Sequence, residues 1–114
     1  MSDADCLFCK IVEGAIPADV VVETDEALAF RDINPQAPTH VLVIPRSHHA
    51  NAAELAAAAP TTLAHLVDVA ARVAEGDGID DYRLVLNTGP GVGQTVFHVH
   101  LHVMGGRAMT WPPG

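Results

Sequence analysis

Three histidines at alternate positions near the end of the chain constrain its fold more than any other feature. They lie in the run His98-Val99-His100-Leu101-His102-Val103. Because side chains alternate between the two faces of a β-strand, a strand here would carry the three imidazoles on one face and apolar side chains on the other. A lone histidine in a strand is usually a hydrogen-bonded core residue. Three in register indicate a surface that carries chemistry.

The chain has 114 residues and a mass of 12.0 kDa, which predicts a single domain spanning residues 1–114. Hydrophobic residues make up 49% and charged residues 18%, as in a soluble globular protein. No apolar run approaches the roughly 18 residues that a membrane span needs. Residues 1–5 are acidic and lack the basic start and apolar stretch of a secretory signal, so we expect a cytoplasmic protein without membrane association.

The charge balance argues against a nucleic-acid partner. Fourteen acidic side chains face six basic ones, which gives a formal net charge of −8. A field of this sign opposes nonspecific binding to a phosphate backbone. Any nucleotide ligand would therefore depend on local contacts.

The pattern of apolar residues predicts an α+β fold with a mostly antiparallel, five-stranded sheet. One long helix, residues 60–76, repeats apolar residues at three- and four-residue steps and packs on one face of the sheet. The Ala-rich stretch 52–59 is assigned no element. The remaining predicted elements are a short helix over 6–13 and strands over 20–23, 27–30, 40–44, 82–87 and 98–104.

The histidine run and the segment before it suggest covalent chemistry on a phosphate. A neutral imidazole is a good nucleophile near neutral pH, and His100 lies between two further histidines. The Gly-rich segment 87–95 precedes the run, and its backbone N–H groups could approach an anion without obstruction by Cβ atoms. By itself such a segment is more often a plain hairpin connection.

Cys6 and Cys9 form a Cys-x-x-Cys pair that is too closely spaced for the disulfide framework of a secreted domain. Three interpretations stay open: half of a zinc site, a redox pair, or two inert thiols in the core.

Several motifs in this order resemble the histidine triad (HIT) superfamily, in its branch of Hint-type nucleoside phosphoramidate hydrolases. The resemblance covers nearly the whole chain. The matching stretches are 8–11 (FCKI), 16–18 (IPA), 28–33 (LAFRDI), 35–45 (PQAPTHVLVIP), 93–103 (GQTVFHVHLHV), 105–107 (GGR) and 111–114 (WPPG).

The resemblance implies a catalytic role for three histidines. His100 would attack the α-phosphorus of a purine nucleoside 5′-phosphoramidate and form a nucleotidyl-histidine intermediate, which water then releases as the nucleoside monophosphate. His40 and His102 would bond around the nucleophile and the phosphate. His40 would have to reach them from an adjacent strand. No cofactor is required for this chemistry.

The resemblance also implies a binding site for an AMP- or GMP-type ligand. Asp32 would hold the ribose hydroxyls, although out of this context it would be read as a loop carboxylate that caps a turn. Thr95 stands where relatives often have serine, and Arg31 where they commonly have histidine beside the base pocket. Ile33, Phe8 and Phe30 would line the base pocket, and the phosphate-binding positions would be Asn87, Gly93, Gln94 and Thr95.

Some members of the superfamily have a structural zinc site, and here its ligands would be Cys6, Cys9, His48 and His98, with His49 as the alternative to His48. His65, in the long helix, is assigned no role. The segment 105–114, which contains Trp111, would lie near the active-site edge of a second subunit. The resemblance therefore implies a homodimer with a continuous sheet, in which the long helix and the last strand pair across a two-fold axis.

Three other functions compete with the phosphoramidate hydrolase. A dinucleoside polyphosphate hydrolase or nucleotidyl transferase would share the nucleophile. A nucleotide-binding regulator would use the same site without turnover. A catalytic metal held by the histidine run is disfavoured, because three neighbours on one strand diverge too far to bind one ion. The sequence leaves the physiological substrate and the base preference open.

Overall fold

The computed structural model describes residues 4–114, so most of the acidic start on which the expectation of no export rests lies outside the described residues. The five strands form one sheet in the order β1-β2-β3-β5-β4, and all neighbouring strands are antiparallel. This confirms the predicted α+β class. The elements are α1 Leu7–Val12, β1 Val20–Glu23, β2 Ala27–Arg31, β3 Thr39–Pro45, α2 Ala52–Ala58, α3 Pro60–Gly76, β4 Tyr82–Val85, the 3₁₀ turn Pro90–Val92 and β5 Leu101–Gly105.

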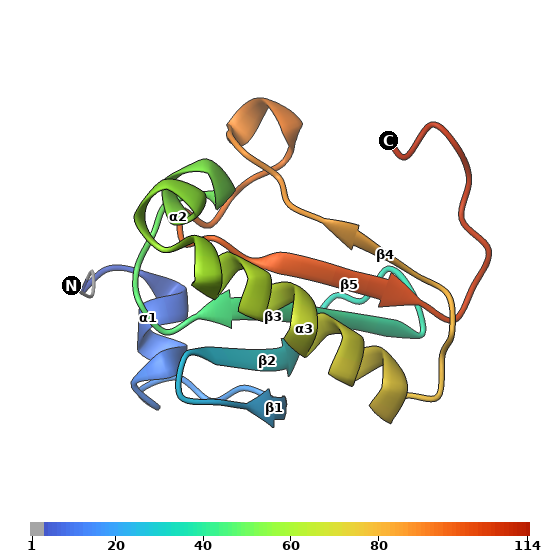
Figure 1. The fold of residues 1–114 in the computed structure, drawn as a ribbon, viewed down its shortest axis with the longest axis horizontal. Helices are drawn as coiled ribbons and strands as arrows, with labels where there is room; N and C mark the ends of the chain where they lie inside the picture. Colours follow the sequence, from blue (N-terminus) through green and yellow to red (C-terminus); the bar gives the residue numbers. More distant parts are fainter. Residues whose placement is uncertain (1–3) are drawn as a thin grey trace.

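Helix α3 covers one face of the sheet (Figure 1). Pro60 occupies its first turn, where the missing N–H costs no hydrogen bond. Leu66, Val69, Ala70 and Val73 form its buried stripe. They pack on every second residue of the strands, which are Ala27, Ala29, Val41, Val43, Leu101 and Val103. The period-3.6 and period-2 patterns therefore meet in one core, as the sequence predicts.

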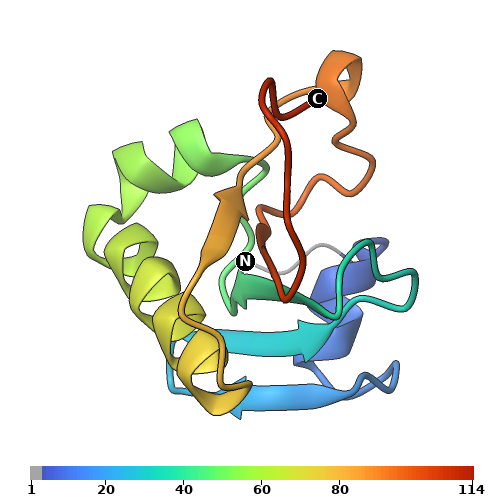
Figure 2. The ribbon, with the colours of Figure 1, turned by 90° about the vertical axis from the view of Figure 1, so that its right-hand side faces the viewer.

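Helix α1 covers the other face of the sheet (Figure 2). Its buried residues Phe8 and Cys9 pack, together with Cys6, on Leu28, Phe30, Leu42 and Ile44. The alternation along β2 and β3 thus separates two cores. One is the aliphatic core under α3, and the other is the smaller core under α1, which contains both cysteines.

The prediction that all three histidines of the run lie in the last strand is wrong. Strand β5 begins at Leu101, so only His102 is in the strand. The ladder with β3 extends from the pair Thr39 and Gly105 to the pair Val43 and Leu101. Further on, Pro45 has no N–H to donate, and its carbonyl accepts from the Nε2–H of His98 at 2.8 Å. The ladder ends there, and His98 turns toward α1.

The assignment of no element to residues 52–59 is also wrong, because Ala52–Ala58 is helix α2. Asn51 caps it, with its side chain accepting from the N–H of Glu54 at 3.0 Å. An Asn three residues before a Glu, followed by alanines, is a helix start in sequence terms. The structure thus has a second short helix that the prediction lacked.

Strands β4 and β5 end at residues that differ from the expected bounds. Strand β4 ends at Val85, two residues short of the predicted end. Gly105 is the last residue of β5, and a Cβ there would lie 2.8 Å from the carbonyl oxygen of Asp81. This position needs glycine, because the connection from α3 to β4 crosses directly over it.

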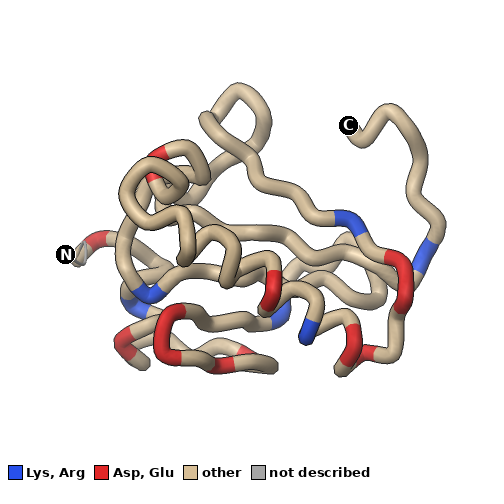
Figure 3. Tube along the Cα trace, in the orientation of Figure 1, with Lys and Arg blue, Asp and Glu red and all other residues tan. Residues whose placement is uncertain are grey.

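None of the helices in residues 4–114 combines the length and apolar character needed to cross a bilayer. Acidic positions outnumber basic ones along the chain, and the few basic positions are scattered (Figure 3).

Candidate active site and metal centre

Two histidines meet from neighbouring strands on the face of the sheet opposite α3. His40 lies near the start of β3, and His102 lies in β5 opposite Leu42. The Nε2 atom of His40 is 2.9 Å from Nδ1 of His102, and the two rings are 5.2 Å apart between centroids. His40 therefore reaches the histidine run from an adjacent strand.

Hydrogen bonds fix which nitrogen of each ring carries the proton. The backbone N–H of Gln36 donates to Nδ1 of His40 at 3.0 Å, so the proton of a neutral His40 is on Nε2. His40 then donates to Nδ1 of His102, which places the proton of neutral His102 on Nε2. His102 thus presents an N–H donor on the side away from His40.

His100 has the opposite arrangement. Its Nδ1 lies 2.9 Å from the carbonyl oxygen of His98, and only an N–H can bond to a carbonyl. The proton is therefore on Nδ1, and Nε2 keeps a lone pair. The ring lies 5.0 Å from the ring of His102 and 5.0 Å from that of Phe8. A nucleophilic nitrogen and an N–H donor thus occupy neighbouring rings.

Burial keeps these rings neutral at neutral pH. It lowers the pKa of His102 to about 4, repulsion from His100 and His40 adds to the effect, and the charge of Asp32 opposes it. Burial also lowers the pKa values of His40 and His100, against the opposing effect of Asp32 and, for His100, the bond to the carbonyl of His98. A neutral His100 has its lone pair available for attack.

Phe8 links the aromatic residues of this face. Its ring lies edge-to-face with Phe30 at 5.6 Å and with His98 at 6.0 Å, in addition to its contact with His100. Phe8 and Phe30 are each only 5% exposed. Ile33, the third residue expected to line the base pocket, is fully exposed, so the structure does not bring it against the two phenylalanines.

Asp32 lies beside the histidine pair at the start of the β2–β3 loop. One oxygen, Oδ1, accepts from the N–H of Asn34 at 2.8 Å, and the other, Oδ2, lies 3.5 Å from Nε2 of His40. The turn-capping function and the position beside the histidines therefore coexist in one side chain.

The Gly-rich segment is shaped by Gln94, which is almost fully buried. Its Oε1 accepts from the N–H of Gly89 at 2.8 Å, and its Nε2 donates to the carbonyls of Ala50 and Val96. The side chain is thus committed to holding the loop. Gly93 has a φ of +98°, which favours glycine, and Thr95 is exposed. Asn87 is half-buried beyond the end of β4.

Both cysteines and two histidines converge under α1. Cys6 and Cys9 are buried and are not joined in a disulfide. The Nδ1 atom of His98 is 3.5 Å from both Sγ atoms, and Nδ1 of His48 is 3.4 Å from Sγ of Cys9. The four ligand atoms all lie within 4.8 Å of one another.

This geometry fits a tetrahedral zinc ion. With Zn–S of about 2.3 Å and Zn–N of about 2.0–2.1 Å, sulfur and nitrogen ligands of one ion lie about 3.5–3.6 Å apart. The Nε2–H of His98 is held by the carbonyl of Pro45, which leaves Nδ1 deprotonated and directed at the thiols. His48, not His49, joins the cluster, because Nε2 of His49 bonds to Ser47.

Asp32, His40 and His102 also bring three metal-ligating atoms within 4.8 Å of one another. The N–H of Gln36 on Nδ1 of His40 leaves its Nε2 protonated, without a lone pair for an ion. His40 is thus hydrogen-bonded to His102, and Asp32 lies beside it at 3.5 Å.

The geometry corrects the expectation for Arg31. Arg31 does not lie beside the base pocket: it follows Ala27 and Ala29 on the α3 side of the sheet and pairs with Asp77 at 2.8 Å. His65 lies away from the histidine cluster, and its Nε2 is 2.8 Å from Oγ1 of Thr24 in the β1–β2 turn.

Sequence reasoning missed the groups that orient the imidazoles. They are the N–H of Gln36 and the carbonyls of Pro45 and His98, all of which are main-chain atoms. No side-chain pattern signals them.

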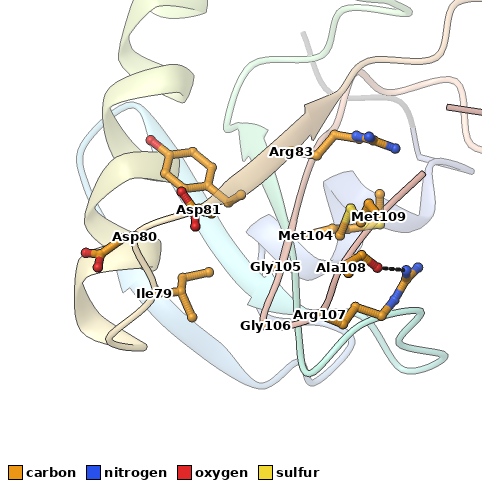
Figure 4. Close-up of a pocket in the computed structure, with 11 residues that line it drawn as sticks. Ile79, Asp80, Asp81, Arg83, Met104, Gly105, Gly106, Arg107, Ala108 and Met109 are labelled. Atoms are coloured by element: carbon orange, nitrogen blue, oxygen red, sulfur yellow. Dashed lines mark hydrogen bonds between the residues drawn. The ribbon is translucent and has the colours of Figure 1, made fainter. Parts of the chain in front are cut away.

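A cavity of about 590 Å³ lies between strands β4 and β5 and the C-terminal segment. Figure 4 shows Arg83 and Arg107 flanking Met104 and Met109 in its wall. It contains none of the histidines. Met104 pairs with His40 in the β3–β5 ladder and lies two residues after His102 in β5, so this hollow adjoins the histidine pair.

Comparisons with known proteins agree with this geometry. An uncharacterised HIT-like protein from Synechococcus elongatus is 50% identical over 111 residues, covering 96% of this chain and 97% of that protein. A 14 kDa zinc-binding protein from Zea mays is 45% identical over 117 aligned residues, covering all of this chain and 91% of its own length.

A crystal structure of a HIT family hydrolase from Legionella pneumophila superposes with a TM-score of 0.92 at 51% identity, covering 96% of this chain and all of that one. The model of the HIT domain matches residues 13–109, which include His40 and the whole histidine run. With the alternating histidines, the antiparallel sheet and this match in agreement, the chain belongs to the HIT domain family.

Proposed function

We propose that this protein is a Hint-type hydrolase that cleaves purine nucleoside 5′-phosphoramidates to the nucleoside monophosphate and an amine. One observation carries the proposal. His100 keeps a lone pair on Nε2 because its Nδ1–H bonds to the carbonyl of His98, while the neighbouring His102 is set as an N–H donor by His40. A nucleophile and a donor side by side are what displacement at phosphorus requires.

The reaction divides into two displacements. In the first, Nε2 of His100 forms a bond to the α-phosphorus as the phosphorus–nitrogen bond of the substrate breaks, and the amine leaves with a proton from a neighbouring acid. In the second, water attacks the phosphorus and gives up a proton to the group that protonated the amine, the bond to His100 breaks and the nucleoside monophosphate is released. The Nε2–H of His102 stabilises the phosphate charge during both steps.

The nucleotide is held by groups around this pair. Asp32 accepts from the ribose hydroxyls, since its Oδ2 is bound only by a long contact to His40. Amides of the Gly-rich loop, the Thr95 hydroxyl and Asn87 meet the phosphate. The base packs toward Phe8 and Phe30. The resemblance of the motifs to the Hint-type branch supports these assignments.

The test is release of AMP from adenosine 5′-phosphoramidate by the wild type and by His100→Ala, with a chelator present. We expect the substitution to lower kcat by about 10⁴-fold or more, because it removes the nucleophile. Dinucleoside polyphosphates are assayed alongside. Faster turnover of these would replace the phosphoramidate with that substrate class, and AMP binding without turnover of either would make the protein a nucleotide-binding regulator.

A structural zinc ion held by Cys6, Cys9, His48 and His98 is part of the proposal. It rests on the 3.4–3.5 Å spacings, on the free Nδ1 of His98 and on the similarity to the maize zinc-binding protein. Bound zinc would brace α1 against the loop before β5. Metal analysis of protein purified without added zinc should give about one ion per chain, and a value near zero would contradict the site.

We also propose that the single domain, residues 1–114, forms a cytoplasmic homodimer. The last strand, β5, lies between β3 and β4 and cannot pair with a second copy as the sequence led us to expect. Strand β4 is at the sheet edge instead, where its outer backbone groups are available to a second copy. The cavity beside it and Trp111, which is 83% exposed, lie on or near the C-terminal segment 105–114 and would gain cover there. Light scattering at micromolar concentration should give twice the chain mass.

A further inference from the structure

A carboxylate at the end of α3 joins three elements on the side of the sheet away from the histidines. Asp77, which caps the helix, accepts from both terminal nitrogens of Arg31 at 2.8 and 2.9 Å. Its Oδ2 also accepts from the hydroxyl of Thr39 at 2.7 Å. Thr39 is buried, and the side chain of Asp77 is 20% exposed. The two-point bond to Arg31 has a defined geometry that a single surface ion pair lacks.

The two partners of Asp77 occupy equivalent places next to the site. Arg31 is the last residue of β2 and is followed by Asp32, whereas Thr39 is the first residue of β3 and is followed by His40. Because neighbouring residues of an extended chain point to opposite sides, anchoring one from the α3 side fixes the other toward the site. Asp77 thus holds both ends of the loop 32–38.

The loop needs such an anchor. Ile33, the second residue of the loop, is fully exposed, and the N–H of Asp32 bonds to the carbonyl of His40 at 3.0 Å. The same two residues face each other through their side chains at 3.5 Å. A small shift of either strand end would change where Oδ2 of Asp32 lies relative to the histidine pair.

Arg31 and Asp77, the ion pair that anchors the loop, also keep their charges as the pH changes. Hydrogen bonds from Arg31, then from Thr39, lower the pKa of Asp77, and the bond to Asp77 raises the pKa of Arg31. Both groups stay ionised throughout the range in which the neighbouring histidines titrate.

We propose that Asp77 is a positioning residue for ribose recognition, acting through Arg31 and Thr39 on Asp32 and His40. This inference rests on the proposed function, in which Asp32 binds the ribose hydroxyls. Asp77 itself lies on the opposite side of the sheet from the reacting groups and touches neither substrate nor nucleophile.

The test compares a ribose with a dideoxyribose substrate. The ratio of kcat/KM for adenosine 5′-phosphoramidate to that for its 2′,3′-dideoxy analogue reports how well Asp32 meets the hydroxyls. Asp77→Asn keeps the size of the side chain but loses the charged two-point bond. We expect it to reduce the ratio by about tenfold, mainly through a higher KM for the ribose substrate, since a misplaced hydrogen bond to a charged group is lost.

The matched control is Asp68→Asn on the same helix. Asp68 pairs with Arg72 at 2.9 Å on the exposed surface, so this variant removes a helix ion pair with no connection to the loop. Its ratio should equal that of the wild type. Arg31→Lys keeps the charge opposite Asp77 without the two-point bond and should give an intermediate ratio.

The outcomes separate this inference from the proposed function. An unchanged ratio in Asp77→Asn, in protein with a native circular dichroism spectrum, overturns the positioning role, as does a wild type that does not distinguish the two sugars. If the wild type turns over neither substrate, the proposed hydrolysis fails on its own. Calorimetry with AMP and 2′,3′-dideoxy-AMP then applies the same ratio to binding, with the same expected tenfold change.

Discussion

His98 and His102 are the two ends of one histidine run, and their similar rings present opposite groups. His98 presents a lone pair, and His102 presents an N–H. Burial lowers the pKa of each to about 4, so both are neutral. In His98 the Nε2–H is held by the carbonyl of Pro45, and the lone pair on Nδ1 faces two thiols. In His102 the Nδ1 lone pair is taken by His40, and Nε2 carries the proton.

The difference lies in the partner of each ring. A main-chain acceptor makes His98 a ready metal ligand, whereas a donor imidazole makes His102 an N–H donor. His100 lies between them and receives its orientation from the carbonyl of His98. The run thus has a cysteine end at His98, which faces Cys6 and Cys9, and a relay end at His102, which bonds to His40. Each end can be disabled separately, and each loss should leave its own measurable change.

The largest expected effect is on the cysteine end. Cys6→Ser removes one sulfur ligand but keeps an acceptor for the N–H of Cys9, which now bonds to Sγ of Cys6 at 3.3 Å and caps α1. We expect zinc to be lost and the free energy of unfolding to fall by about 4 kcal/mol when free zinc exceeds its dissociation constant about 1,000-fold. Metal analysis and urea unfolding measure both.

Cys6→Ser also tests how separate the two ends are. Adding a chelator to the wild type should reproduce the loss of stability, and adding it to the variant should change nothing further. A variant that keeps its zinc would show that Cys6 is not a ligand.

The relay end should respond in catalysis and not in metal content. His40→Ala removes the donor to His102 and frees the proton of that ring to move to Nδ1. We expect kcat to fall by about 100-fold, the scale on which the loss of one hydrogen-bond donor to the transition-state charge acts. His40→Gln can still accept from Gln36 and donate to His102, and it should recover part of the rate. Loss of zinc in either variant would contradict the separation of the two ends.

A further effect is the pH dependence of stability contributed by His102. Its pKa is about 4 in the folded chain and about 6.5 when unfolded, so the folded state binds fewer protons between these values. The contribution of neutral His102 is complete above pH 6.5 and is lost as the pH falls toward 4. The slope is at most about 1.4 kcal/mol per pH unit.

His102→Asn isolates this contribution. The amide oxygen can accept from His40 in place of Nδ1 but does not titrate. The difference in unfolding free energy between wild type and variant should therefore shrink as the pH is lowered from 7 to 4.5 in urea titrations. A difference independent of pH would mean that His102 is charged or exposed in the folded chain.

The layers of the fold could be predicted from the sequence because they depend on the period of apolar side chains. Two errors of the prediction have a signal in the sequence that could correct them. Arg31 shares the parity of Ala27 and Ala29, which face α3, and Pro45 marks where the ladder to the histidine run must stop. Both signals are local and were available in the residues themselves.

The proton positions on the rings could not be predicted in this way. They depend on the N–H of Gln36 and on the carbonyls of Pro45 and His98, and every residue type except proline offers the same main-chain groups. Only the tertiary arrangement decides which carbonyl meets which ring. The sequence therefore predicts where imidazoles gather, and the packing decides which of them turn a lone pair toward the thiols and which present an N–H.

The smallest effect comes from a residue outside both ends. Asn51→Ala removes the side chain that accepts from the N–H of Glu54 and starts α2. Loss of such a cap costs about 1 kcal/mol, so urea unfolding should show a drop of that size with zinc content and kcat unchanged. Because the variant lowers stability without touching either cluster, it is the control for the others. A change in kcat as large as that of His40→Ala would mean that the relay end depends on overall stability and not on its own hydrogen bonds.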